Sequence, residues 1–174
     1  GFVEYVQVTL SNPANSQLPL STDWRFSTSS RLWVDFALTS TADAMKQYRI
    51  ARTSDDNVRA YVNGSKQYAF NCSEEAVNQS TSKAISTTRY AWVIDNVGNR
   101  CFITNVTSGA LFTSATHASS KKDYTKNGVV YLGANNTATG GGCRYYGFKG
   151  WDGDEQKVEL IPCEVDGQVG FLDF

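Results

Sequence analysis

The sequence predicts an all-β fold, and within that class a two-sheet antiparallel β-sandwich. Strand-favouring residue types are abundant, whereas the chain of 174 residues contains a single Met. Where a period can be read, apolar side chains recur every second residue. About a dozen such short runs are separated by polar loops, which is typical of a sandwich and not of a parallel α/β sheet.

One domain, spanning residues 1–174, is the simplest organisation. A chain of this length buries roughly 70% of the surface that its unfolded form exposes, so it can build a core without additional cross-links. We find no linker and no internal repeat, so the prediction is a single domain.

The first half of the chain contains one long strand and two hairpins. Residues 31–38 (RLWVDFAL) place four apolar side chains on one face. Asn63-Gly64 lies between two alternating runs and is the strongest short hairpin signal. Residues 89–95 and 100–106 flank the loop NVGN and predict a second hairpin. The only helix signal of note, SEEAVNQ from Ser73, predicts no more than one or two turns.

The C-terminal third predicts four strands, within residues 128–134, 143–151, 157–163 and 167–174. The segment GWDGDEQKVEL at residues 150–160 does not fit a helix-flanked calcium loop, because that loop has its glycine at position 6 and not at position 2. Asp-Gly between alternating runs is instead a preferred hairpin turn. With Asp152-Gly153 as the turn, Trp151 pairs with Asp154, and Cys143 comes opposite Pro162.

Four cysteines without C-x-x-C spacing, and a single histidine, argue against a zinc site, so no metal ligand is predicted. The even count predicts two disulfides in an oxidising compartment. The register above brings Cys143 near Cys163, but the connectivity stays open among three possibilities. The disulfide candidates are Cys72, Cys101, Cys143 and Cys163.

Charge and hydropathy exclude two classes of partner. The 16 basic and 17 acidic residues nearly cancel, and no basic run exceeds Lys121-Lys122, so nucleic acid is not an expected partner. No apolar run reaches the length of a membrane span. The chain starts at Gly1 without an initiator Met or a charged-then-apolar leader, so we expect that a signal peptide has been removed or left out of the sequence.

No catalytic residue is predicted. A glycosidase needs two carboxyls facing one groove, and the nearest pairs, Asp152 with Asp154 and Glu164 with Asp166, fall in expected turns or loops. We interpret them as solvated acids. His117 lies in a polar stretch without a nucleophile elbow, so we expect a surface histidine. Whether the chain is an enzyme is left open, and a non-catalytic role is favoured.

Aromatic residues are the remaining candidates for binding. We expect Trp33 and Trp92 to fill the core, where aromatic rings contribute the largest apolar area. Trp24 and Trp151 lie in or near polar turns, and for them core packing and ligand contact remain equally open. Trp24 and Trp151 are therefore the candidate ligand-binding residues.

Both ends of the chain carry motifs of a known family. The C-terminal segment has a strand ending in Leu-Gly-Ala, then a Tyr-x-Phe-Lys strand, a Pro-Cys ending and a closing Val-Gly-Phe-x-Asp. The N-terminal segment EYVQVTLSNPANSQLPLSTDWRFSTSSRLWVDFAL supplies an opening strand, a Gln-containing bend and a long alternating strand. This pattern resembles the LamG-like jelly-roll domains of the concanavalin A-like lectin/glucanase superfamily. The matching C-terminal positions are Tyr131, Leu132, Gly133, Ala134, Tyr146, Phe148, Lys149, Leu160, Ile161, Pro162, Cys163, Val169, Gly170, Phe171 and Asp173.

The resemblance implies a two-sheet antiparallel jelly roll and a secreted, periplasmic or cell-surface location, or use as a module of phage structural proteins. The sequence departs from the family pattern at two places. The glycine that usually precedes the Gln of the bend is absent near Gln17, and relatives often carry a further hairpin beyond the position of Phe174. The Glu-x-Asp-x-x-Glu motif of glucanase relatives is incomplete, since Glu164 and Asp166 are followed by Val169. No position matches a lectin calcium motif; no cofactor is expected, and a loop-bound calcium is left open.

Three functional hypotheses follow from these observations. The first is a non-catalytic binding or adhesion module with carbohydrate as the favoured ligand class. The second is a structural or protein-interaction domain without a small ligand, with a surface protein as its partner. The third, least favoured, is a glycoside hydrolase.

Overall fold

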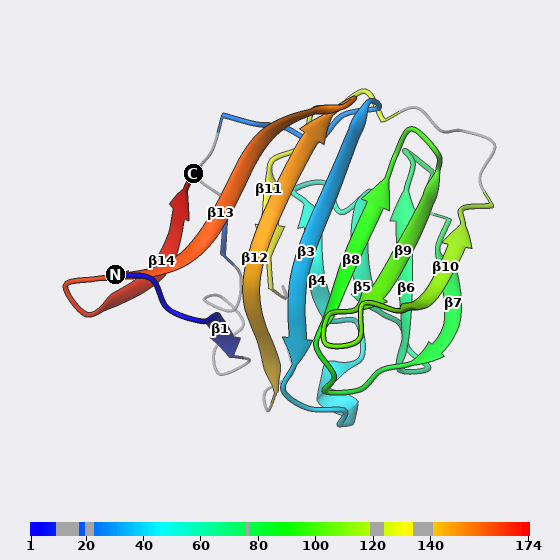
Figure 1. Cartoon of the computed structure of the whole chain (residues 1–174). Coiled ribbons are helices and arrows are strands. Elements are labelled where there is room, and N and C mark those ends of the chain that lie inside the picture. Colours follow the sequence, from blue (N-terminus) through cyan, green and yellow to red (C-terminus); the bar gives the residue numbers. More distant parts are fainter. Residues whose placement is uncertain (10–17, 20–22, 76, 119–123, 134–140) are drawn as a thin grey trace.

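The computed structural model shows two antiparallel β-sheets packed face to face (Figure 1). It describes residues 1–9, 18–19, 23–75, 77–118, 124–133 and 141–174. The predicted all-β sandwich is confirmed. A 3-10 helix at Asp43–Met45 is the one helical segment in the described residues, and residues 73–75 form a bend where a short helical turn was expected.

The larger sheet contains eight strands among the described residues, in the order β10-β9-β8-β3-β12-β13-β14, with β1 also paired to β12. All its neighbouring strands are antiparallel. The bounds are β1 (Val6–Thr9), β3 (Ser30–Leu38), β8 (Tyr90–Asp95), β9 (Arg100–Asn105), β10 (Leu111–Thr116), β12 (Gly142–Asp152), β13 (Glu155–Val165) and β14 (Gln168–Asp173).

The smaller sheet has the order β2-β11-β4-β5-β6-β7. Both predicted hairpins are confirmed: β5 and β6 surround Asn63-Gly64, and β8 and β9 surround the NVGN loop. The bounds are β2 (Leu18–Pro19), β4 (Arg49–Thr53), β5 (Val58–Val62), β6 (Gln67–Cys72), β7 (Gln79–Ala84) and β11 (Val130–Leu132).

Aromatic rings from both sheets meet in the core. Tyr68 of the smaller sheet lies edge-on to Trp92 and Phe36 of the larger sheet, with ring centroids 5.6 and 6.2 Å apart. All three side chains are fully buried. Edge-to-face pairs of this kind add about 0.5–1.5 kcal/mol each to the energy of burial. The expectation for Trp92 is confirmed.

The β12–β13 hairpin has a different turn from the one predicted. Asp152 pairs with Glu155 and Trp151 with Gln156, so the two turn residues are Gly153 and Asp154. Gly153 has a φ of +57°, which a glycine adopts without strain. The sequence-based turn was wrong by one residue, and a bulge after Gly150 shifts the register once more.

This register also bears on the cysteines, which are all unpaired in the structure. The predicted cross-strand pair does not form, because Cys143 lies opposite Val8 and Leu38 while Cys163 lies opposite Gly170. Burial raises the pKa of Cys72 and of Cys101 to about 12. These two thiols are therefore protonated at neutral pH.

Two further expectations concern residues outside the core strands. His117 was expected on the surface but is 3% exposed, and its ring lies edge-on to Phe70 with centroids 5.6 Å apart. The motif residue Ala134 lies outside the described residues. Within the described part of the chain, no helix has the length and apolar character needed to cross a membrane.

Candidate functional site

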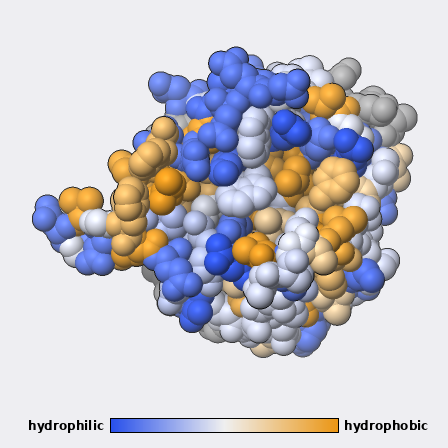
Figure 2. Space-filling model, viewed as in Figure 1, coloured by the Kyte–Doolittle hydropathy of each residue, from blue (hydrophilic) through white to orange (hydrophobic). Residues whose placement is uncertain are grey.

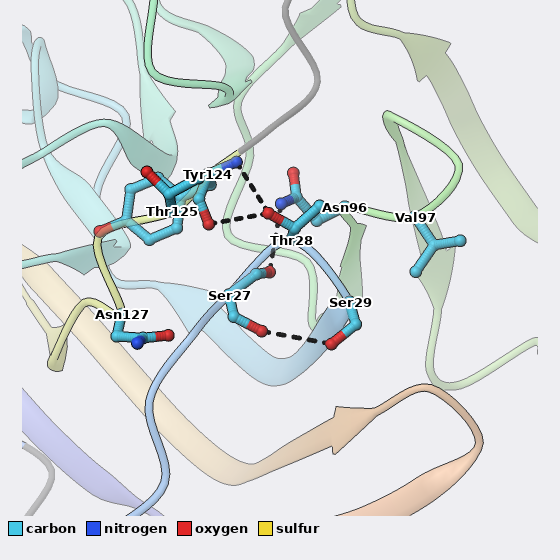
Figure 3. Close-up of a pocket in the computed structure, with 8 residues that line it drawn as sticks. All are labelled: Ser27, Thr28, Ser29, Asn96, Val97, Tyr124, Thr125 and Asn127. Carbon is cyan, nitrogen blue, oxygen red and sulfur yellow. Dashed lines mark hydrogen bonds between the residues drawn. The ribbon is translucent and has the colours of Figure 1, made fainter.

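A cleft opens at the end of the sandwich where β3 begins and β8 ends. These two strand ends lie toward the top of Figure 1. Its volume is about 620 Å³. Three separate segments contribute to it: the turn before β3, the β8–β9 turn and the segment before β11. The lining residues are Ser27, Thr28, Ser29, Asn96, Val97, Tyr124, Thr125 and Asn127 (Figure 3).

A second depression of about 490 Å³ adjoins the first, since Ser27 and Asn127 line both. Its remaining walls are charged or aromatic, in contrast to the neutral first part. We refer to the two depressions together as the polar cleft. The residues specific to the second part are Asp23, Trp24, Arg25, Asp152 and Lys157.

The serine-rich turn before β3 is held by its own hydrogen bonds. The Ser30 N–H donates to the Ser27 carbonyl oxygen at 3.1 Å, and the Ser27 N–H donates to Ser30 Oγ at 2.9 Å. The Ser27 and Ser29 hydroxyls lie 3.3 Å apart and point toward each other (Figure 3). A Ser side chain that bonds its own backbone favours turns, which is why this run forms the rim and does not extend β3.

Tyr124 connects this turn to the smaller sheet. Thr28 Oγ1 donates to the Tyr124 carbonyl oxygen at 2.9 Å, and the Tyr124 hydroxyl donates to Asp55 Oδ2 at 2.8 Å. Burial is the main reason that the pKa of Tyr124 is raised, so the phenol is a neutral donor. A Cβ on Gly128 would lie 2.7 Å from Thr53 Cβ and would also collide with this phenol. The glycine is what lets the Tyr124 hydroxyl lie so close to the backbone.

Asn96 forms the buried wall of the polar cleft. Its residue exposure is 1%, and its Nδ2 donates to the Ser27 carbonyl oxygen at 3.2 Å. Its backbone N–H donates to the Ser30 carbonyl oxygen at 3.1 Å. Its Oδ1 is buried without a hydrogen-bond donor. An unpaired acceptor in such a position is unusual, because most buried polar atoms find a partner.

Trp24 and Asp152 form the other side of the cleft. The indole N–H donates to Asp152 Oδ1 at 3.3 Å, and Ser30 Oγ donates to the same oxygen at 2.9 Å. The Trp24 ring lies against Phe148, with centroids 6.0 Å apart, and a Cβ on Gly150 would come within 2.7 Å of the ring. Trp24 is thus partly a packing residue and partly a cleft residue.

Trp151 lies on the opposite face of β12, with the Arg31 guanidinium 5.5 Å from its ring centroid. The structure therefore does not bring the two candidate tryptophans into one site. Trp33 was expected in the core, but it is half-buried on the same outer face, below Lys149. Its register neighbours in the larger sheet are Lys149 and Val93.

The carboxyl pairs considered from the sequence are not brought together in a groove. Asp154 is exposed in the hairpin turn, and Glu164 and Asp166 are exposed at the far end of β13. Asp152 lines the cleft instead with Asp23. Among the residues that the structure describes, no group of three or more His, Cys, Asp or Glu side chains is arranged to hold a metal ion.

Sequence reasoning found Trp24 but missed most of the polar cleft. Thr28 and Tyr124 are 96 positions apart, and no short pattern links them. The available signals were the run of serines and threonines from Ser27 to Ser30 and the NVGN loop, both of which read only as turns. Asp152 was taken as a turn residue, although its carboxylate faces inward to two donors.

We compared the chain with known protein families, with curated proteins and with solved structures. No known protein family and no curated protein matches the chain. Among solved structures, a sialidase is similar over 79% of this chain, with 7% identity and a TM-score of 0.43. The chain corresponds to 14% of the length of that sialidase chain. At this level of similarity the match supports no conclusion about activity.

Proposed function

We propose that this chain is a non-catalytic carbohydrate-binding module whose ligand lies in the polar cleft. The observation that carries the proposal is the set of neutral hydroxyl and amide side chains that line the first part of the polar cleft. Hydroxyl and amide groups both donate and accept hydrogen bonds, as sugar hydroxyls do. Trp24, at the adjoining edge, adds an aromatic surface.

The family and location are part of the same proposal. The two-sheet antiparallel sandwich and the matching positions at both ends of the sequence support a LamG-like, concanavalin A-like module. Such a module would be secreted, periplasmic or on the cell surface. We expect that the module needs no cofactor, and a role for calcium is tested together with binding.

A broad glycan array, run with calcium and with a chelator, tests the proposal. We expect weak binding of neutral glycans, and Asn127→Ala and Ser29→Ala are expected to weaken it about 2- to 10-fold each, the cost of one hydrogen bond. Trp151→Ala is the matched control, because its ring lies on the outer face. No binding under either condition would overturn the proposal, and loss of binding in Trp151→Ala alone would move the site to the outer face.

The glycoside-hydrolase alternative rests on two carboxylates, Asp23 and Asp152, which line the same part of the cleft. Asp152 Oδ1 accepts hydrogen bonds from Trp24 and Ser30, which hold the carboxylate in place at the cleft. The test is to incubate each bound glycan with the protein and to measure new reducing ends, which distinguishes a hydrolase from a non-catalytic module. Release of sugar that Asp152→Asn abolishes would replace the non-catalytic proposal.

A further inference from the structure

Beyond the polar cleft, the structure has a second unusual surface at the end of β13 and in β14. We call residues 161–174 the arm, because they leave the sandwich at the left of Figure 1. Here β13 no longer pairs with β12, whose first half pairs with β1. Among the described residues, β14 pairs only with β13, so its outer edge is unpaired.

Apolar side chains are concentrated on the arm. Of the eight exposed large apolar residues in the described part of the chain, four lie in the arm, and a fifth, Phe2, touches Phe174 with ring centroids 6.0 Å apart. Figure 2 shows hydrophobic side chains gathered over the projecting region. The four arm residues are Val165, Val169, Leu172 and Phe174.

The charge on the arm has one sign. Glu164, Asp166 and Asp173 are acidic, and residues 161–174 contain no Lys, Arg or His. Asp166 and Asp173 flank the apolar run of β14, seven positions or roughly 20 Å apart along an extended chain. In the described residues, no side chain of the arm forms an ion pair.

The acidic ends argue against pairing of β14 with a second copy of itself. In an antiparallel pair centred on Gly170, Gly167 of one copy lies opposite Asp173 of the other. Asp166 then lies beside Asp173 at both ends of the pair, and like charges in these positions are destabilising. If the partner strand instead places basic residues next to Asp166 and Asp173, the repulsion between carboxylates is replaced by attraction between opposite charges.

We propose that β14 is a docking edge for an extended segment of a partner protein, which adds a strand to the larger sheet. The partner strand carries Lys or Arg at both ends of a run with alternating apolar residues. Backbone hydrogen bonds supply affinity, as in other cases of strand addition, and the two flanking carboxylates set the register. An uncovered edge strand otherwise invites aggregation, which proteins normally prevent with charges or covering segments.

The test uses a synthetic peptide, Lys-Val-Thr-Val-Thr-Val-Thr-Lys, and its counterpart with Glu at both ends. We expect fluorescence anisotropy to show at least 10-fold tighter binding of the Lys peptide, with an affinity that falls as salt rises. The double variant Asp166→Lys/Asp173→Lys is expected to invert this preference. The matched control, Asp43→Lys/Glu155→Lys, changes net charge equally at exposed sites elsewhere and is expected to keep the wild-type preference.

Three outcomes would overturn the proposal. The first is equal or absent binding of the two peptides to the wild-type protein. The second is inversion of the preference in the control variant, which would mean that net charge alone decides binding. The third is a wild-type dimer, detected by light scattering, that Leu172→Glu dissociates, because the occupant of the edge would then be a second copy. Circular dichroism of each variant verifies that it folds.

Discussion

The polar cleft and the arm differ in how their side chains are held. At the cleft, Ser27, Asn96 and Tyr124 come from three segments and are joined by side-chain hydrogen bonds to backbone or carboxylate oxygens. In the arm, the described side chains form no hydrogen bond or ion pair, and Val165 and Phe174 are 63% and 73% exposed. Long-range bonds fix a binding surface before a ligand arrives, whereas an unpaired edge depends on a partner to complete it. Substitutions in the two regions test this contrast, from the largest expected effect to the smallest.

Gly128→Ala is expected to have the largest effect. A Cβ there would overlap Thr53 and the Tyr124 phenol, so we expect a loss of about 1–3 kcal/mol in the free energy of unfolding, typical of overpacking. Gly170→Ala in the arm is the matched control, because no other atom lies within 4 Å of the place its methyl group would take, and its effect should stay below about 0.5 kcal/mol. Urea denaturation measures the free energy of unfolding of both variants. Equal losses would contradict the idea that the cleft is packed more tightly than the arm.

Tyr124→Phe comes next, with an expected loss of about 0.5–1.5 kcal/mol in the free energy of unfolding. The variant removes the phenol that donates to Asp55 and leaves the ring in place. Tyr146→Phe is the control, since Tyr146 lies half-buried on the outer face below Arg89. Thermal unfolding of both variants gives the difference, and the idea of a bonded cleft fails if Tyr146→Phe costs more.

Stability is expected to fall in mild acid because of His117. Burial lowers the pKa of His117 in the folded protein, so the unfolded chain binds the proton more tightly. The contribution of neutral His117 to the free energy of unfolding is fully present above the pKa of the unfolded chain, about 6.5. It is lost as the pH falls below that value toward the lower pKa of the folded protein. His117 is the only histidine, so His117→Gln should flatten the dependence between pH 7 and 5. If the stability of His117→Gln falls with pH as steeply as that of the wild-type protein, the loss of stability in acid is due to carboxylates and not to His117.

Leu172→Ser is expected to be nearly neutral, within about 0.5 kcal/mol, because the side chain is 45% exposed on the arm. The same variant should weaken binding of the Lys-ended peptide, since it removes an apolar contact of the docking edge. Urea denaturation and anisotropy measure the two effects separately. A large loss of stability would show that the arm is packed more tightly than its exposure indicates.

Much of the fold could be predicted because it depends on local pattern. The alternation in residues 31–38 and the two hairpin signals suffice to identify β3, β5, β6, β8 and β9. The turn at Gly153 was wrong by one residue, because Asp-Gly and Gly-Asp both fit a two-residue loop and the bulge after Gly150 has no sequence signal. Cys143 and Cys163 are apart for another reason, because β12 pairs with β1 at Cys143 while β13 no longer pairs with β12 beyond Leu160.

The candidate site was less predictable than the fold. Trp24 was identified as aromatic in a polar stretch, but the contacts that define its role come from Asp152 and Phe148, more than 120 positions away. Trp33 and Trp92 occupy similar alternating runs, yet only Trp92 faces the other sheet. Period-two patterns show that two faces differ, but where both faces carry large apolar residues they do not show which one is inside.

By itself, the sequence determined the fold class, because strand propensity, period-two alternation and turn residues act over a few neighbouring positions. It also determined the near-zero net charge and the acidic character of the arm, which are properties of composition. Only the tertiary structure decided which polar residues meet in the cleft, that His117 is buried, and that the edge of β14 is unpaired among the described residues. Those outcomes depend on register and sheet order, which are set by contacts between segments far apart in the chain.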